Sequence, residues 1–279
     1  MSQTPELKHI RSLDGYDFID MGASSGNSLD AFQRRIGGTG LGGDNDEVKV
    51  SKAQDMGRNV VLGSALDVSE IPGQVSFVTC DNFLEHLPSC EDADAAVGCA
   101  AAVARDFIYI RHPSFEDVEY LGNLGLKTFW TDWEVHPIRL RIADLIGMLH
   151  AHGVMTIKTI PVMRIRDSND PHILPLEAPT GEHHYKPEHG DKPHPAVEFE
   201  RGVYYAYDIV GLLPDSSREM PVLEYKDRLG SDKRPAFHPG AAEEYARRLE
   251  ADIAALKSRK CYVLAEKISR FTSRLRNTK

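Results

Sequence analysis

The sequence lacks several features that mark particular classes of protein. Its four cysteines form no CxxC pair, which argues against a zinc knuckle or a disulfide framework and favours reduced packing residues. It has no run of about 18 apolar residues, and its amino terminus has no apolar signal-peptide core, so a cytoplasmic protein is expected. The formal net charge of −9 argues against a general nucleic-acid binder, because neutralising phosphates needs a basic surface. The charge does not argue against binding of a nucleotide-sized ligand.

Short apolar runs alternate with helical patterns over residues 16–165, which predicts a parallel sheet flanked by helices. The segment "DADAAVGCAAAVARD" fits a crossover helix, and "IRLRIADLIGMLHAHGV" fits a second helix that ends near Gly153. The predicted strands are Phe18–Met21, Thr39–Gly42, Asn59–Leu62, Val75–Cys80, Phe107–Ile110, "VMTIKTIPVMRI" and "GVYYAYDIVGLL".

Residues 167–199 separate the last two strands and have a different composition. They contain six prolines, with many histidines and acids and no hydrophobic period, which predicts a long loop. An excursion of this kind makes the two flanking strands antiparallel neighbours. The expected organisation is a domain over residues 1–212, which includes the loop, followed by a linker and helical extension over residues 213–279.

The predicted extension has two apolar stripes at helical spacing. The stripes are Tyr245, Leu249, Ile253 and Leu256, then Leu264, Ile268, Phe271 and Leu275. Six Lys/Arg and one Glu between Lys260 and Lys279 give a local charge of +5. Packing on the domain or on a second copy in a homo-oligomer is one interpretation, and contact with a membrane surface or an anionic partner is the other.

The stretch "YDFIDMGASSGNSLDAF" predicts a strand, a glycine loop and a helix, which together present backbone N–H groups to a ligand. A dinucleotide fingerprint needs G-x-G-x-x-G, but Leu29 occupies the third glycine position. Asp20 would also repel a pyrophosphate. A carboxylate beside this loop suits a cationic ligand, and S-adenosylmethionine carries an ammonium and a sulfonium.

Asp44 ends the second predicted strand and has two interpretations. Its carboxylate is suited to accept both hydroxyls of a ribose, as acids at this place do in dinucleotide sites. Alternatively, Asp44 or Asn45 caps the helix that follows. The two roles are compatible.

Four ordered motifs then give a family resemblance over about residues 16–165: "FIDMGASSG", "GGDND…A…G", "VVLGSALDV" and "SFVTCDNFLEHLP". The chain resembles the class I S-adenosylmethionine-dependent methyltransferases, in particular the type 11 and type 12 group with "LEHLP". The resemblance implies an α/β, Rossmann-like, seven-stranded, mostly parallel sheet with helices on both faces and an antiparallel last strand. It makes residues 1–212 the cofactor-binding domain.

The resemblance also assigns the cofactor site. Asp20, Gly22, Ser24 and Gly26 line the methionine end, Asp44 holds the ribose, and Asn45 flanks the adenine. Ser64 and Ala65 stand where the family usually has Asp-Ala, so Ser64 is a departure for which Asp67 is a substitute. Asp81, Asn82 and Phe83 lie beneath the methionine portion and the departing methyl.

Three histidines are the catalytic candidates. His86 lies in "LEHLP", His112 ends the fifth strand, and His136 precedes a helix at whose start the family often carries a histidine. Each is open to a packing or capping role as well as to acting as a base or contacting the acceptor. Nearby aromatic residues, Phe115, Tyr120, Trp130 and Trp133, suit a sugar-stacking wall or a core.

The loop residues Glu182, His183, His184, His189, Asp191 and His194 have no metal-ligand spacing, so no metal is expected and a lid over the substrate is the favoured role. The predicted function is methyl transfer from S-adenosylmethionine to a small molecule or saccharide at oxygen. The alternatives are an NAD-type oxidoreductase and a catalytically silent cofactor-binding or scaffolding protein.

Overall fold

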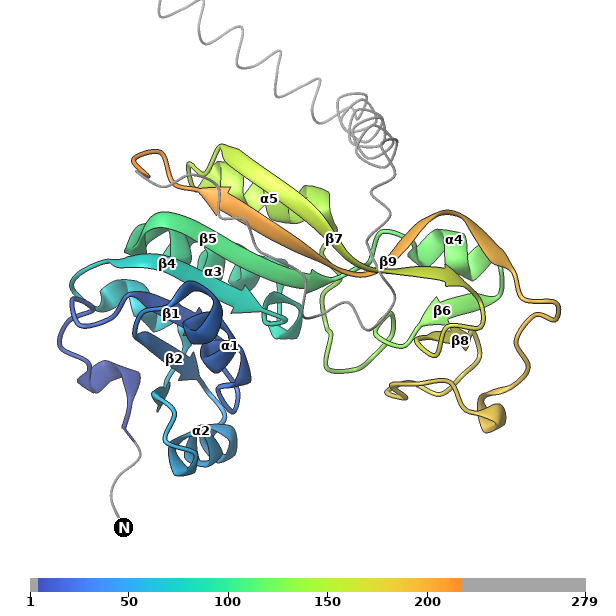
Figure 1. Cartoon of the computed structure of the whole chain (residues 1–279), viewed down its shortest axis with the longest axis horizontal. Coiled ribbons are helices and arrows are strands. Elements are labelled where there is room, and N and C mark those ends of the chain that lie inside the picture. Colours follow the sequence, from blue (N-terminus) through green and yellow to red (C-terminus); the bar gives the residue numbers. More distant parts are fainter. Residues whose placement is uncertain (1–4, 217–279) are drawn as a thin grey trace, which may run out of the picture. The chain divides into compact units, whose positions relative to one another are not determined.

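The structure is a computed structural model that describes residues 5–216 (Figure 1). Its centre is a seven-stranded sheet in the order β3-β2-β1-β4-β5-β9-β7. The strands are β1 (Phe18–Met21), β2 (Gly40–Asp44), β3 (Val60–Leu62), β4 (Val75–Asp81), β5 (Ala104–Pro113), β7 (Thr156–Asp167) and β9 (Glu198–Leu212). The strands β1 to β5 pair in parallel, and β9 runs antiparallel to both β5 and β7. The predicted mostly parallel sheet with an antiparallel last strand is confirmed.

The connections between the parallel strands are largely helical. The α-helices are α1 (Asn27–Ile36), α2 (Glu47–Asp55), α3 (Cys90–Val103), α4 (Val118–Asn123) and α5 (Ile142–Ala151). Single 3₁₀ turns are η1 (Leu7–His9), η3 (Leu84–His86) and η4 (Pro187–His189), and η2 is longer (Ala65–Glu70). Ser89 caps α3 by accepting a hydrogen bond from the Asp92 amide, and α5 ends just before Gly153, which has a φ of 83°.

A phenylalanine ladder crosses the middle of the sheet. Phe18 on β1, Phe77 on β4 and Phe107 on β5 are register partners, so their rings stack at 4.8 and 4.7 Å. All three side chains are buried together with Leu29 and Phe32 of α1. Stacking across parallel strands fixes the register of β1 against β4, and that register sets which polar groups meet at the carboxyl edge.

A second, smaller sheet was not expected from the sequence. Strands β6 (Leu126–Thr128) and β8 (Ile173–Pro175) pair antiparallel and adjoin α4 (Figure 1). Strand β8 and η4 both fall within 167–199, so two three-residue elements interrupt the long loop that the sequence predicts there. Three-residue strands are too short to produce a visible alternation, and their stability comes from a buried cluster that includes Phe115, Trp130, Ile165 and Phe199.

The predicted helical extension, with its basic stretch, lies outside the described residues. Within residues 5–216, none of the helices has the length and apolar character needed to cross a membrane.

Candidate cofactor and acceptor site

The loop between β1 and α1 follows a backbone path that few residues adopt. Gly22 and Ser24 have φ values of 70° and 51°, in the left-handed region. The amides of Gly22 and Ala23 donate to the Gly43 carbonyl, which holds the loop against the end of β2. Helix α1 starts after Gly26 without a side-chain cap. The loop therefore presents backbone, rather than side chains, at a helix amino terminus.

Gly22 also lies directly against Phe83, which follows β4. A Cβ atom on Gly22 would come within 2.2 Å of Phe83 Cδ2, whereas a Cβ on Gly43 would meet nothing within 4 Å. We expect Gly22→Ala to lower the stability of the loop by about 1–2 kcal/mol, since both the φ value and the contact oppose a side chain. Thermal unfolding and ligand titration would measure this. Gly43→Ala is the matched control. Equal effects of the two substitutions would contradict the explanation that the φ value of Gly22 and its contact with Phe83 oppose a side chain.

Asp20 is fully buried under this loop rather than exposed beside it. Its carboxylate accepts hydrogen bonds from Thr79 Oγ1 at 2.6 Å and from the Ser28 hydroxyl, and Thr79 is its register partner on β4. Burial raises the pKa of Asp20 to about 7, opposed by these two hydrogen bonds and reinforced by the nearby Asp81 and Asp44 carboxylates. In this structure the Asp20 side chain links the start of α1, through Ser28, to β4, through Thr79. Its contact with a cationic ligand stays a prediction.

The raised pKa of Asp20 makes stability depend on pH. Between about pH 4 and 7 the folded state holds a proton that the unfolded chain has lost, so the Asp20 contribution to stability falls as pH rises through that window. We expect Asp20→Asn to raise the free energy of unfolding at pH 8 by about 1–3 kcal/mol and to flatten its pH dependence. Urea unfolding at pH 5 and pH 8 checks this; parallel pH profiles for the two proteins would contradict it.

Asp44 lies at the carboxyl end of β2 and faces the loop between β1 and α1. Its two oxygens accept from the amides of Ser24 at 2.8 Å and Asp46 at 2.9 Å. The helix cap is Asp46, which accepts from the Val48 and Lys49 amides, so the prediction that Asp44 or Asn45 caps α2 is wrong. The cap falls one residue later because α2 begins at Glu47. Asn45 is exposed beside Asp44.

The adenine-side candidates form the start of η2. The Ser64 hydroxyl caps this turn by accepting from the Leu66 amide at 3.2 Å, and Ala65 is buried. Asp67 is exposed on the same turn. The Gly63 amide donates to the Asp44 carbonyl, so η2 begins next to the ribose candidate.

Strand β4 ends with Asp81 at the same edge of the sheet, and Asn82 and Phe83 follow it. Asn82 has a φ of 51°, and its side-chain amide donates to Asp81. Burial raises the pKa of Asp81, and the positive charge of Arg111 opposes that rise. The structure thus brings the ends of β1, β2 and β4, with their candidate residues, to one edge.

A buried ion pair lies behind this edge and was not found from the sequence. Arg111 on β5 donates through Nε and Nη2 to both oxygens of Asp208 on β9, at 2.5 and 2.6 Å. The Tyr109 hydroxyl donates to the same carboxylate at 2.8 Å. Arg111 and Asp208 are 5% and 1% exposed. The partners are 97 residues apart, so only the pairing of β5 with β9 brings them together.

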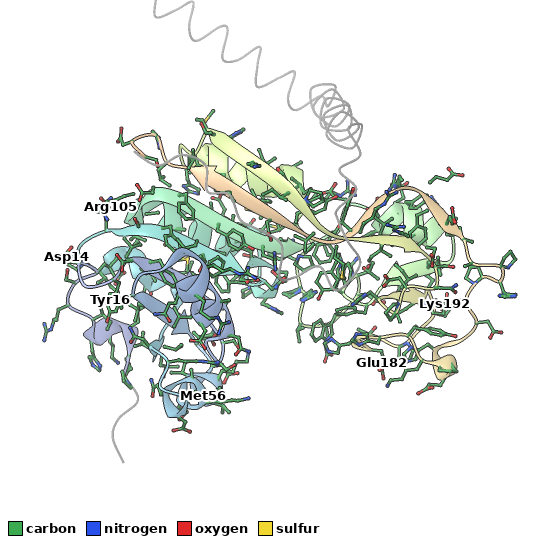
Figure 2. All side chains as sticks on the ribbon, in the orientation of Figure 1. Asp14, Tyr16, Met56, Arg105, Glu182 and Lys192 are labelled. Atoms are coloured by element: carbon green, nitrogen blue, oxygen red, sulfur yellow. The ribbon has the colours of Figure 1, made fainter. Side chains whose placement is uncertain are left out.

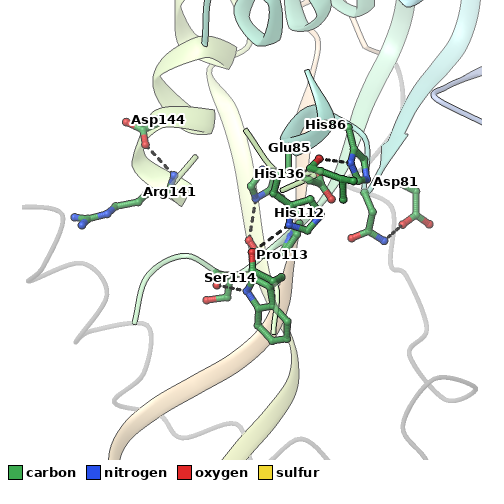
Figure 3. A network of polar contacts seen from close by, with 12 residues as sticks. Asp81, Glu85, His86, His112, Pro113, Ser114, His136, Arg141 and Asp144 are labelled. Carbon is green, nitrogen blue, oxygen red and sulfur yellow. Dashed lines mark hydrogen bonds and ion pairs between the residues drawn. The ribbon is translucent and has the colours of Figure 1, made fainter. Parts of the chain in front are cut away.

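The three candidate histidines converge with Glu85 at the ends of β4 and β5 (Figure 3). We call Glu85, His86, His112 and His136 the histidine–glutamate cluster. The rings of His86 and His136 lie 4.9 Å apart, and His112 Nε2 lies 3.9 Å from Glu85 Oε2. Burial lowers the pKa of both His112 and His136 to about 4 and raises that of Glu85 to about 8. Glu85 lies in "LEHLP" beside His86 but was not singled out, because no pattern marks it as buried.

Aromatic and imidazole rings continue from this cluster toward the second sheet. His136 contacts Trp133 at 4.9 Å, and Trp133 contacts His183 at 4.5 Å between ring centroids. His183 and His184 both lie near Phe129. Of the four aromatic residues that the sequence places near the histidines, Phe115 and Trp133 contact His136 and Trp130 contacts Phe129, whereas the ring of Tyr120 contacts Phe199.

Of the other loop candidates, Glu182 and His189 approach each other, with Glu182 Oε2 3.8 Å from His189 Nε2. His189 is buried and accepts from the Lys186 amide, while Glu182 pairs with Lys186 at 2.8 Å. Asp191 and His194 are exposed. Figure 2 shows Glu182 and Lys192 in the part of the structure that holds β6 and β8.

The strand order and the antiparallel β9 define a Rossmann-like fold of the methyltransferase type. The sequence itself matches no family model and no curated protein. Among solved structures, it is similar to an S-adenosylmethionine-dependent methyltransferase from Archaeoglobus fulgidus, with a TM-score of 0.51, 16% identity, and coverage of 74% of this chain and 89% of the other.

Two further structures are similar at lower scores. The magnesium protoporphyrin IX methyltransferase of Synechocystis PCC 6803, with bound S-adenosylmethionine, has a TM-score of 0.41 and 14% identity over 72% of this chain and 71% of its own. The YcgJ protein of Bacillus subtilis has a TM-score of 0.45 and 16% identity over 74% of this chain and 95% of its own. The first similarity establishes the fold.

Proposed function

We propose that this chain binds S-adenosylmethionine and transfers its methyl group to a small-molecule or saccharide acceptor, at oxygen. The observation that carries the proposal is the meeting of the left-handed loop of β1 with the Asp44 carboxylate of β2 at the carboxyl edge of a methyltransferase-type sheet. Ligands of open α/β sheets bind at this edge.

The residues at this edge suit the cofactor. The close approach of Gly22 to Phe83 leaves the loop backbone, not a side chain, next to the bound ligand. Each carboxylate oxygen of Asp44 has two lone pairs, so Asp44 can accept hydrogen bonds from ribose hydroxyls in addition to those from the two backbone amides. Asp20, Asp81 and Asp44 make the edge acidic, which favours a sulfonium and an ammonium over a pyrophosphate. When bound, the cofactor supplies an electrophilic methyl group.

The acceptor side is assigned to the histidine–glutamate cluster and the ring array beyond it. Rings such as Trp133 and Phe129 suit the flat, apolar faces of sugars and of aromatic molecules. His112 and His136 are weak bases because of their low pKa values, so His86, which is exposed, is the best placed of the three to contact the acceptor. Much of the rate enhancement can come from positioning the acceptor in line with the methyl group. The segment over 167–199 then acts as a cover for the acceptor.

Two other functions compete with this one. An NAD-type oxidoreductase would place a pyrophosphate next to buried carboxylates and lacks the third glycine at Leu29. A silent cofactor-binding protein is favoured by Ser64, whose hydroxyl serves as a helix cap rather than as an acidic adenine contact.

Calorimetry with S-adenosylmethionine, its demethylated product and NAD separates these functions. We expect saturable binding of the first two and none of NAD; tight binding of NAD alone would overturn the proposal. Turnover is tested by formation of the demethylated product with panels of glycans, phenols and amines. Binding without turnover on every panel would favour the silent protein.

A further inference from the structure

Three separate segments supply the histidine–glutamate cluster. Glu85 and His86 lie on η3, His112 lies near the end of β5, and His136 lies in the stretch between β6 and α5 (Figure 3). Glu85, His86 and His136 each place one potential metal-ligand atom within 4.8 Å of the other two. Among residues 5–216, this is the one group of three or more histidine, cysteine or acidic side chains that lie this close together. His112 is not part of that group, but its Nε2 lies 3.9 Å from Glu85 Oε2 and is the nearest further donor to that carboxylate.

Each histidine is oriented by a backbone carbonyl. The Nδ1 atoms of His86, His112 and His136 lie 2.8, 2.9 and 3.2 Å from the carbonyl oxygens of Val135, Pro113 and Trp130. A carbonyl oxygen can only accept, so Nδ1 carries the hydrogen and Nε2 of each neutral ring keeps a free lone pair. This is the arrangement in which imidazoles bind metal ions, because the second hydrogen bond fixes the tautomer and the ring.

The buried donors at the centre of the cluster lack hydrogen-bond partners. Among the described residues, neither oxygen of Glu85 nor Nε2 of His112 has a partner, although these side chains are only 1% and 2% exposed. Buried polar atoms in folded proteins nearly always have hydrogen-bond partners, and a bound ion is one established reason for an exception. The 3.9 Å between His112 Nε2 and Glu85 Oε2 is too long for a hydrogen bond, so the two groups do not satisfy each other.

We propose that Glu85, His86, His112 and His136 bind one divalent transition-metal ion, with zinc the best match. Three imidazoles and one carboxylate suit zinc and its neighbours, whereas magnesium and calcium prefer all-oxygen sets. Tetrahedral zinc with bonds of about 2.0–2.1 Å places its ligand atoms about 3.3 Å apart, so small side-chain rotations close the site for Glu85, His86 and His136, and a larger movement of His112 completes it. The exposed ring of His86 gives the ion a way in from solvent.

The metal would join the ends of β4 and β5 to the stretch between β6 and α5. The expectation of no metal rests on the ligand spacing in residues 182–194, and Glu85 lies outside that segment. The inference goes beyond the proposed methyl transfer and does not rest on it. An ion on the three Nε2 atoms would occupy the lone pairs that a general base needs, so it also bears on how the acceptor is activated.

The test is zinc titration of the untagged full-length protein after chelator treatment, by calorimetry with a competing chelator. We expect one equivalent of zinc per chain, a rise in melting temperature with zinc, and no competition from millimolar magnesium. Glu85→Gln and His86→Ala should each weaken zinc binding at least 10-fold. His86 is exposed, so His86→Ala keeps the test valid if the buried substitution unfolds the protein.

His150→Ala is the matched control, because His150 is an exposed histidine on α5 outside the cluster. It should leave zinc affinity and stoichiometry unchanged. Failure to bind a full equivalent, or equal affinity in the wild type and both cluster variants, overturns the proposal. Neither assay uses S-adenosylmethionine, so a negative result leaves the proposed function untouched, and failure of methyl transfer leaves the metal site untouched.

Discussion

Asp208→Ala is expected to destabilise the protein by about 3–5 kcal/mol, because it leaves the Arg111 guanidinium buried without its carboxylate. The Tyr109 hydroxyl loses its acceptor in the same change. Chemical denaturation monitored by circular dichroism would measure the loss as a lower midpoint at constant slope.

The comparison is with a histidine–carboxylate contact near the surface. Asp94 lies 3.2 Å from His152, and both side chains are substantially exposed. Asp94→Ala should therefore change stability far less, since exposed pairs are screened by solvent. A similar, small change in both variants would mean that Arg111 reaches water or another partner when Asp208 is absent.

Asp44→Ala is expected to weaken S-adenosylmethionine binding by about 1–3 kcal/mol, which is roughly 5- to 150-fold in dissociation constant. The physical reason is the loss of a carboxylate that holds the Ser24 amide of the loop and that we propose accepts the ribose hydroxyls. Calorimetric titration of the cofactor and of its demethylated product would both show the loss.

Asp46→Ala is the matched control, two residues further on. It removes the cap of α2 and should cost about 1 kcal/mol of stability, with little change in cofactor affinity. If Asp46→Ala weakens binding as much as Asp44→Ala, the effect belongs to the start of α2 and not to a ribose contact. The two variants thus separate a ligand contact from a local structural role.

The sheet could be predicted from the sequence because its strands are continuous apolar runs between turn signals. Strand β1 matches its predicted bounds, and β2 to β4 differ by one or two residues at their ends. The second sheet could not be predicted. Its strands are three residues long, and Trp130 and Phe199 are brought to the same buried cluster only by the folded chain.

Side-chain burial, which the sequence does not show, explains why some features of the site could not be predicted. Asp20 looks like a ligand-facing acid in the sequence, but its register with Thr79 turns its oxygens to a hydroxyl partner inside the sheet. His86 and His112 could be selected by their positions after predicted strands, and His136 by its position before a predicted helix. Glu85 could not, because the sequence does not show that its side chain is 1% exposed and unpartnered.

The carbonyl contacts of the histidine–glutamate cluster bear on how this protein could change during evolution. Val135 holds His86 through its main-chain oxygen, while its own side chain is 40% exposed. A backbone carbonyl is the same whatever the residue, so substitutions at Val135 would keep the imidazole in place. The side chain at position 135 can therefore change while the orientation of the His86 imidazole stays the same.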